Sequence, residues 1–136
     1  MRSRDDPPTG ISVRVDEPAM LFRISKTYRL RMSDAELYEA TRGIWVVPGP
    51  RKDNAKYAMA VYQGVVREVY RIDKWDPAGA TPYPTRCFDE QQKRGRSEFV
   101  GGVADEALRE KYIGKSVASY FLRGNVGPVG YVNCTS

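Results

Sequence analysis

Residues 56–72, KYAMAVYQGVVREVYRI, decide the fold. Their β-branched and aromatic residues predict two strands, over 57–62 and 65–72, joined by a tight turn at Gln63-Gly64. Simple alternation along the second strand would put Val66 and Tyr70 on one face and Val65 and Val69 on the other. A β-hairpin is therefore expected at the centre of the chain.

A capped helix precedes this hairpin. In Ser33-Asp34-Ala35-Glu36 the serine can accept a bond from the backbone three residues on, and Glu36 can reach back to Ser33. This capping box predicts a helix over 33–42, with Gly43 as a left-handed C-cap. The two strands expected on this side of the hairpin are 20–24 and 44–47.

The stretch after the hairpin begins with a long irregular segment, 73–95, rich in proline and glycine. Asp105 then caps a helix over 106–112, and a further short helix is expected at 116–122. The remaining expected strands are 97–103 and 129–132.

Short strands outnumber helices in this order. We therefore predict an α+β fold, a small and strongly bent antiparallel sheet or β-barrel with two to three short helices. Residues 1–18 are charged and contain three prolines, so they are expected to form a flexible N-terminal arm. Residues 19–136 are expected to form a single domain, because 136 residues suit one hydrophobic core.

Composition excludes several classes of protein. No stretch approaches the ~20 apolar residues of a membrane helix, and no apolar segment follows the charged N-terminus, so a cytoplasmic location without membrane contact is expected. The chain has no histidine, and its two cysteines do not form a Cys-x-x-Cys pair. His-based catalysis and ordinary zinc sites are thereby excluded. We expect no metal and no cofactor, and a binding module rather than a self-sufficient enzyme.

Basic residues exceed acidic ones by 22 to 17, which gives a net charge of +5. Their clustering favours a polyanionic partner, DNA or RNA. The candidates for phosphate contact are Arg51, Lys52, Lys56, Lys93, Arg94 and Arg96. A further basic cluster comprises Arg109, Lys111, Lys115 and Arg123.

The two tryptophans are the candidates for base contact. Trp45 lies beside the basic loop 51–56, and Trp75 opens the irregular segment. An indole face next to basic loops suits an unstacked base, although a single tryptophan is more often a hydrophobic plug. Arg42 is a candidate for hydrogen bonding to a base edge or a phosphate, and Tyr120 with Asn125 for a further lining.

The run from Leu37 to Trp45, followed by a basic loop and by residues 56–70, resembles the PUA-like superfamily. Its EVE, ASCH and YTH branches share a helix, a strand bearing a tryptophan, a variable loop and two core strands. The resemblance covers about residues 20–75. It implies a PUA-like domain, and it places Trp45 where the YTH branch has a tryptophan of its methylated-base cage.

These observations lead to one hypothesis and three alternatives. The hypothesis is a nucleic-acid-binding module that holds a flipped or modified base between Trp45 and Trp75. The first alternative is a small-ligand domain for a nucleotide or modified nucleoside. The second is a carboxylate-dependent nuclease or hydrolase that uses Asp73, Asp76 or Glu98. The third is an interaction protein whose basic loops bind an acidic partner.

Overall fold

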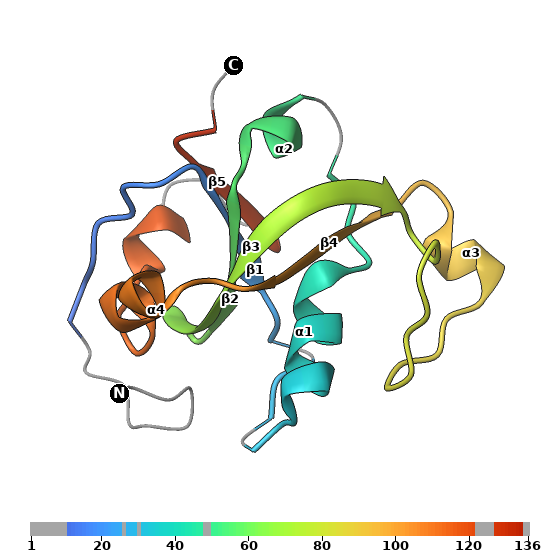
Figure 1. Ribbon diagram of the computed structural model, residues 1–136, viewed down its shortest axis with the longest axis horizontal. Helices are drawn as coiled ribbons and strands as arrows, with labels where there is room; N and C mark the ends of the chain where they lie inside the picture. Colours follow the sequence, from blue (N-terminus) through green and yellow to red (C-terminus); the bar gives the residue numbers. More distant parts are fainter. Residues whose placement is uncertain (1–10, 26, 30, 48–49, 122–126, 135–136) are drawn as a thin grey trace.

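The computed structural model describes residues 11–25, 27–29, 31–47, 50–121 and 127–134. Their strands form one five-stranded sheet in the order β4-β3-β2-β1-β5 (Figure 1). The strands are β1 (Ala19–Arg23), β2 (Tyr57–Tyr62), β3 (Val65–Pro77), β4 (Ser97–Val103) and β5 (Val129–Val132).

The predicted α+β class is confirmed, but the sheet is mixed rather than antiparallel. β1 runs parallel to β2, and the other pairings are antiparallel. The reason is that α1 (Asp34–Arg42) carries the chain from β1 back to the sheet as a crossover, which returns β2 in the same direction. β4 and β5 are the two edges, so the described strands form an open sheet and not a closed barrel.

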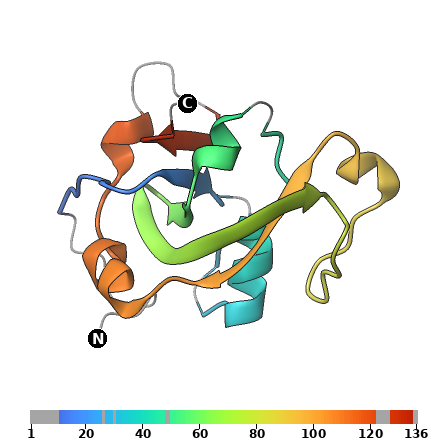
Figure 2. The same cartoon turned by 45° about the horizontal axis from the view of Figure 1, so that its top comes forward.

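The predicted β2–β3 hairpin is present, and its turn residues Gln63 and Gly64 have positive φ angles of 52° and 78°. The sheet is bent, and β3 curves sharply (Figure 2). A register shift opposite Ala60/Val61 interrupts the alternation of β3. As a result Val66 packs with Val69, on the opposite side of the sheet from Tyr70, and the simple alternation expected for this strand is wrong.

The described residues form four short α-helices, compared with the two to three expected. The capping box of α1 is confirmed by bonds of 3.1 and 3.0 Å between Ser33 and Glu36, but Gly43 has an extended backbone instead of a left-handed one. The other helices are α2 (Arg51–Asn54), α3 (Glu90–Lys93), α4 (Glu106–Tyr112) and the 3-10 helix η1 (Ala118–Phe121). α2 and α3 lie in expected loops, because four residues are too few to show helical periodicity.

Two predicted segments differ from the structure. Residues 44–47 do not form a strand, and their contribution to the sheet is a single bridge from Trp45 to Ser97. β3 extends to Pro77, five residues past its predicted end at Ile72, because it pairs with β4 along this length.

The core has two halves, one on each side of the sheet. The first contains Phe22, Leu37 and Phe99 and is covered by α1. The second contains Leu21 and Tyr112 and is covered by α4. β1 is buried on both faces because it lies inside the sheet between these halves.

Residues 11–18, placed in the arm by the sequence, pack against the second half of the core. Val15 is 2% exposed and its backbone N–H donates to Tyr120 Oη at 2.9 Å. The backbone N–H of Asp16 donates to Tyr112 Oη at 3.1 Å. The packed part of the chain therefore begins before Ala19, and residues 1–10 lie outside the described ranges. Among the described residues, none of the helices is long and apolar enough to cross a membrane.

Candidate functional site

A cavity of about 890 Å³ lies where the end of β1, the segment after α1 and β5 meet. We call it the arginine pocket, because four arginines line it and no aspartate or glutamate stands among its described lining residues. The arginines are Arg23, Arg51, Arg86 and Arg96. Trp45 and Tyr131 supply its aromatic surface.

Three of these arginines make no ion pair with a carboxylate of the described residues. The Arg51 guanidinium lies over the Tyr131 ring at 4.1 Å. Arg86 donates to the carbonyls of Gly43 and Glu39, at 2.6 and 2.7 Å, and Arg96 donates to the carbonyl of Ile44 at 3.4 Å. Carbonyls and rings orient a guanidinium without forming an ion pair with it, and no acidic residue stands in the described lining, so the pocket is positive.

The protonation states in the arginine pocket follow from burial. Burial lowers the pKa of Arg86 from its ordinary value, but an arginine starts so far above neutrality that it stays charged. Burial raises the pKa of Tyr131, so its hydroxyl stays protonated at neutral pH. The pocket thus offers cations and a neutral phenol.

Trp45 forms a fixed wall of this pocket. Its indole N–H donates to the carbonyl of Thr41 at 2.7 Å, and its ring packs against Phe22 at 4.9 Å between centroids. Both contacts orient the indole before any ligand arrives, which is what a stacking platform requires.

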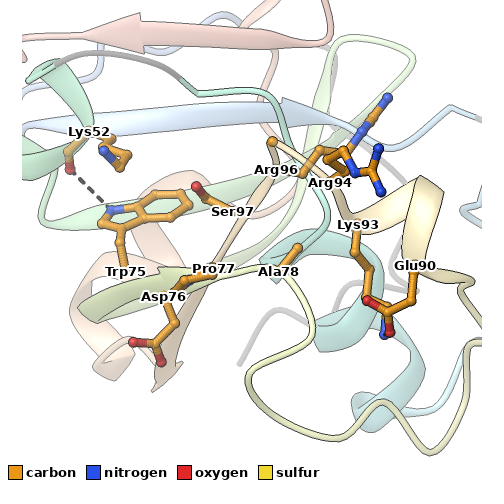
Figure 3. Close-up of a pocket in the computed structure, with 11 residues that line it drawn as sticks. Lys52, Trp75, Asp76, Pro77, Ala78, Glu90, Lys93, Arg94, Arg96 and Ser97 are labelled. Carbon is orange, nitrogen blue, oxygen red and sulfur yellow. Dashed lines mark hydrogen bonds and ion pairs between the residues drawn. The ribbon is translucent and has the colours of Figure 1, made fainter.

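A second cavity, of about 680 Å³, lies beside the end of β3 (Figure 3). We call it the Trp75 pocket. The indole N–H of Trp75 donates to the carbonyl of Lys52 at 3.1 Å, and the ring meets Phe99 edge-on at 5.7 Å. The charged residues that line the Trp75 pocket are Lys52, Asp76, Glu90, Lys93, Arg94 and Arg96.

The Trp75 pocket is less positive than the arginine pocket. Lys93 pairs with Glu90 at 3.2 Å, and Asp76 pairs with Lys74 at 3.5 Å. Arg94 and Arg96 make no ion pair with a described carboxylate, and Figure 3 shows them together, away from Asp76. The fold has thus gathered four candidates for phosphate contact in the lining of one pocket: Lys52, Lys93, Arg94 and Arg96.

The two pockets adjoin. Arg96 lines both of them, and the backbone bridge between Trp45 and Ser97 joins a residue of one to a residue of the other. Phe22 packs against both indoles, at 4.9 and 6.5 Å between ring centroids. Trp45 and Trp75 therefore line separate pockets, and the structure does not place them as the two walls of one base site.

Arg42 does not fit its predicted role at a ligand. It is 5% exposed and pairs with the fully buried Glu98 at 3.2 Å. It also donates to Thr81 Oγ1 and to the carbonyl of Pro82, at 2.6 and 2.7 Å, and lies 3.8 Å from the Tyr83 ring centroid. Arg42 thus holds the irregular segment against α1.

The remaining candidates lie away from both pockets or outside the described residues. Tyr120 accepts the bond from Val15 and helps to hold residues 11–18 in place. Lys56 is exposed and lines neither pocket. Asn125 lies outside the described residues, as does Arg123.

The carboxylates considered for catalysis have structural partners. Glu98 accepts bonds from the backbone of Gly79 and Thr81 as well as from Arg42, and Asp73 pairs with Arg71 at 2.7 Å. The described part of the chain contains no group of three or more metal-binding side chains.

Sequence reasoning missed Arg23, Arg86 and Tyr131, which also line the arginine pocket. The residues around Arg86 in the sequence did not indicate a pocket, because the position of Arg86 depends on contacts between the irregular segment and distant residues. Glu39 fixes this segment by accepting from the backbone and hydroxyl of Thr85, at 2.9 and 2.7 Å. Tyr131 was read as part of a strand, which it is.

No protein-family model, curated protein or solved structure matches this chain. The resemblance to the PUA-like superfamily therefore stays a prediction.

Proposed function

We propose that this protein is a nucleic-acid-binding module, and that the arginine pocket holds one nucleotide unit of the ligand. The observation that carries the proposal is the set of four arginines that line one cavity with Trp45 and Tyr131, without a carboxylate among the described lining residues. Guanidinium groups bind phosphate oxygens through paired N–H donors, and an indole face accepts a base.

The energetics favour an anionic ligand. Positive charges gathered in one pocket repel each other, and protein interiors commonly relieve this by pairing each arginine with an acid. Arg51, Arg86 and Arg96 lack such a partner among the described residues. A bound phosphate would supply the missing negative charge and would gain charge-assisted hydrogen bonds.

A flipped or modified base fits this pocket better than a paired one. The volume of about 890 Å³ lies within the roughly 300–1,000 Å³ of small-molecule sites, which accommodate an extruded base but not a stacked pair. Trp45 is already held in position by Thr41 and Phe22, so stacking costs little ordering.

The element order also supports a proposal about the fold. β1, α1, the Trp45 segment, β2 and β3 follow the order of the PUA-like resemblance. We therefore propose a PUA-like domain, in which the Trp45 segment contributes one bridge to Ser97 instead of a full strand.

A second candidate is a domain for a free nucleotide or modified nucleoside, and the volume of the arginine pocket favours it. The two functions differ in salt dependence. A polynucleotide releases counterions from several phosphates, whereas a nucleoside releases none.

The test is fluorescence-anisotropy binding of labelled DNA and RNA, single- and double-stranded, plain and base-methylated, at two salt concentrations. We expect salt-sensitive binding that Arg51→Gln weakens about tenfold, with a salt slope lower by ~0.7–0.9 for the lost phosphate contact. The matched control is Arg14→Gln, which removes the same charge from an exposed side chain paired with Asp16.

Three results would contradict or redirect the proposal. Absence of oligonucleotide binding at low salt would overturn it. Equal losses in Arg51→Gln and Arg14→Gln would show that general charge, and not the pocket, attracts the ligand. Salt-independent binding of a free nucleoside would favour the second candidate.

A further inference from the structure

We infer that the two pockets bind consecutive nucleotides of a single strand, and that Arg96 contacts the phosphate that links them. This inference rests on the proposed function and deepens it: it names a single-stranded polynucleotide as the ligand class. It also replaces the idea of one base between two tryptophans.

The first argument is the repetition of one kind of site. Each pocket combines an indole with cationic side chains: Trp45 with Arg51 and Arg86 in one, Trp75 with Arg94 in the other. Each indole N–H is bonded to a backbone carbonyl, so both rings are held in place. Two such sites match two bases better than they match one.

The second argument is adjacency. Phe22 packs against both indoles, so the two rings can be no farther apart than its two centroid distances of 4.9 and 6.5 Å together. The pockets also share Arg96, an exposed residue whose guanidinium donates to the carbonyl of Ile44. In a single strand, a phosphate links each pair of neighbouring nucleotides. Arg96 lines both proposed base sites, so it is placed to contact this phosphate.

The third argument concerns strandedness. In a duplex the base faces are stacked on each other, and they cannot reach indoles that line separate hollows. A single strand can turn successive bases outward and place each on an aromatic surface. The pocket geometry therefore favours a single strand, and the chemistry is common to DNA and RNA.

The test measures the binding of a mononucleotide, a dinucleotide, a hexanucleotide and a hexamer duplex to the full chain, each as DNA and as RNA. It includes a dinucleotide whose linking phosphate is an uncharged methylphosphonate. We expect the dinucleotide to bind at least tenfold more tightly than the mononucleotide. The dinucleotide with the uncharged link should bind about tenfold more weakly than the ordinary dinucleotide, because it cannot form the charge-assisted hydrogen bond to Arg96.

The decisive variant is Arg96→Gln. We expect it to bind the charged and the uncharged dinucleotide equally, since it lacks the group that distinguishes them. The matched control is Arg94→Gln, which lines the Trp75 pocket alone. This control should still prefer the charged link, as the unmodified protein does. Urea unfolding of both variants verifies that neither affects folding.

Failure of this inference is distinct from failure of the proposed function. The inference is overturned if the duplex binds as tightly as the single-stranded hexamer, or if the uncharged link costs the same in the unmodified protein and in Arg96→Gln. Either result would leave nucleic-acid binding intact. Absence of binding by every oligonucleotide would overturn both.

Discussion

The α4 side of the sheet and the pocket end are both rich in basic residues, but they use them differently. On the α4 side, Arg109 donates two bonds to Glu68, at 2.9 and 3.1 Å, and Lys111 pairs with Asp16 at 2.8 Å. At the arginine pocket, Arg51 and Arg86 contact rings and carbonyls, and neither forms an ion pair with a described carboxylate.

This difference shows that a basic cluster in a sequence does not by itself indicate a binding surface. Glu68 and Arg109 stand 41 positions apart, and Asp16 and Lys111 stand 95 apart. Partners at such separations are brought together by the fold. A paired cation stabilises the protein, whereas an arginine left without a carboxylate can serve an anionic ligand.

The largest expected effect is on stability, and it concerns the buried ion pair between Arg42 and Glu98. Glu98→Gln would leave Arg42 charged and buried without its partner, and we expect a loss of about 3 kcal/mol in the free energy of unfolding. Urea unfolding measures it. Asp73→Asn, which breaks the exposed pair with Arg71, is the control and should cost much less, because water screens an exposed pair. Similar losses in both variants would show that the buried pair contributes no more to the free energy of unfolding than the exposed pair does.

An intermediate effect compares the two regions directly. Arg109→Met would leave Glu68 buried without its cation, and we expect a loss of about 2 kcal/mol in the free energy of unfolding. Arg51→Met removes no ion pair among the described residues and should change stability by less than ~0.5 kcal/mol. Thermal unfolding of both variants at low salt measures this. The comparison fails if Arg51→Met is as destabilising as Arg109→Met.

Local signals in the sequence predicted the local elements. The hairpin of β2 and β3, the capping box of α1 and the Asp105 cap of α4 each depend on residues within a few positions of each other. The parallel pairing of β1 with β2 had no such signal, because a crossover is a property of chain direction. Neither did the register shift near Val61, which displaced Val66 from its expected face.

The candidate site was predictable only in part, for the same reason. Trp75, Lys93 and Arg96 were singled out by type and by neighbouring charge, and the fold gathers them. Arg42 has the same chemistry as Arg51, but the buried Glu98 opposite it directs it to a structural role. Burial and partner identity are set by distant residues, so residue type alone could not separate these two arginines.

The smallest expected effect is a pH dependence on the α4 side. Hydrogen bonds, from Lys111 first and then from Arg14, lower the pKa of Asp16 below its ordinary value of 3.8. A carboxyl with a lowered pKa in the folded state stabilises the protein above its ordinary pKa, and this contribution is lost as the pH falls through the lowered value. Asp16→Asn removes the titrating group. Between about pH 5 and pH 2 the urea midpoint of the variant should therefore fall less than that of the unmodified protein. The difference should be small, because exposed pairs are screened by water, and parallel curves would mean that Lys111 and Asp16 do not stabilise each other in solution.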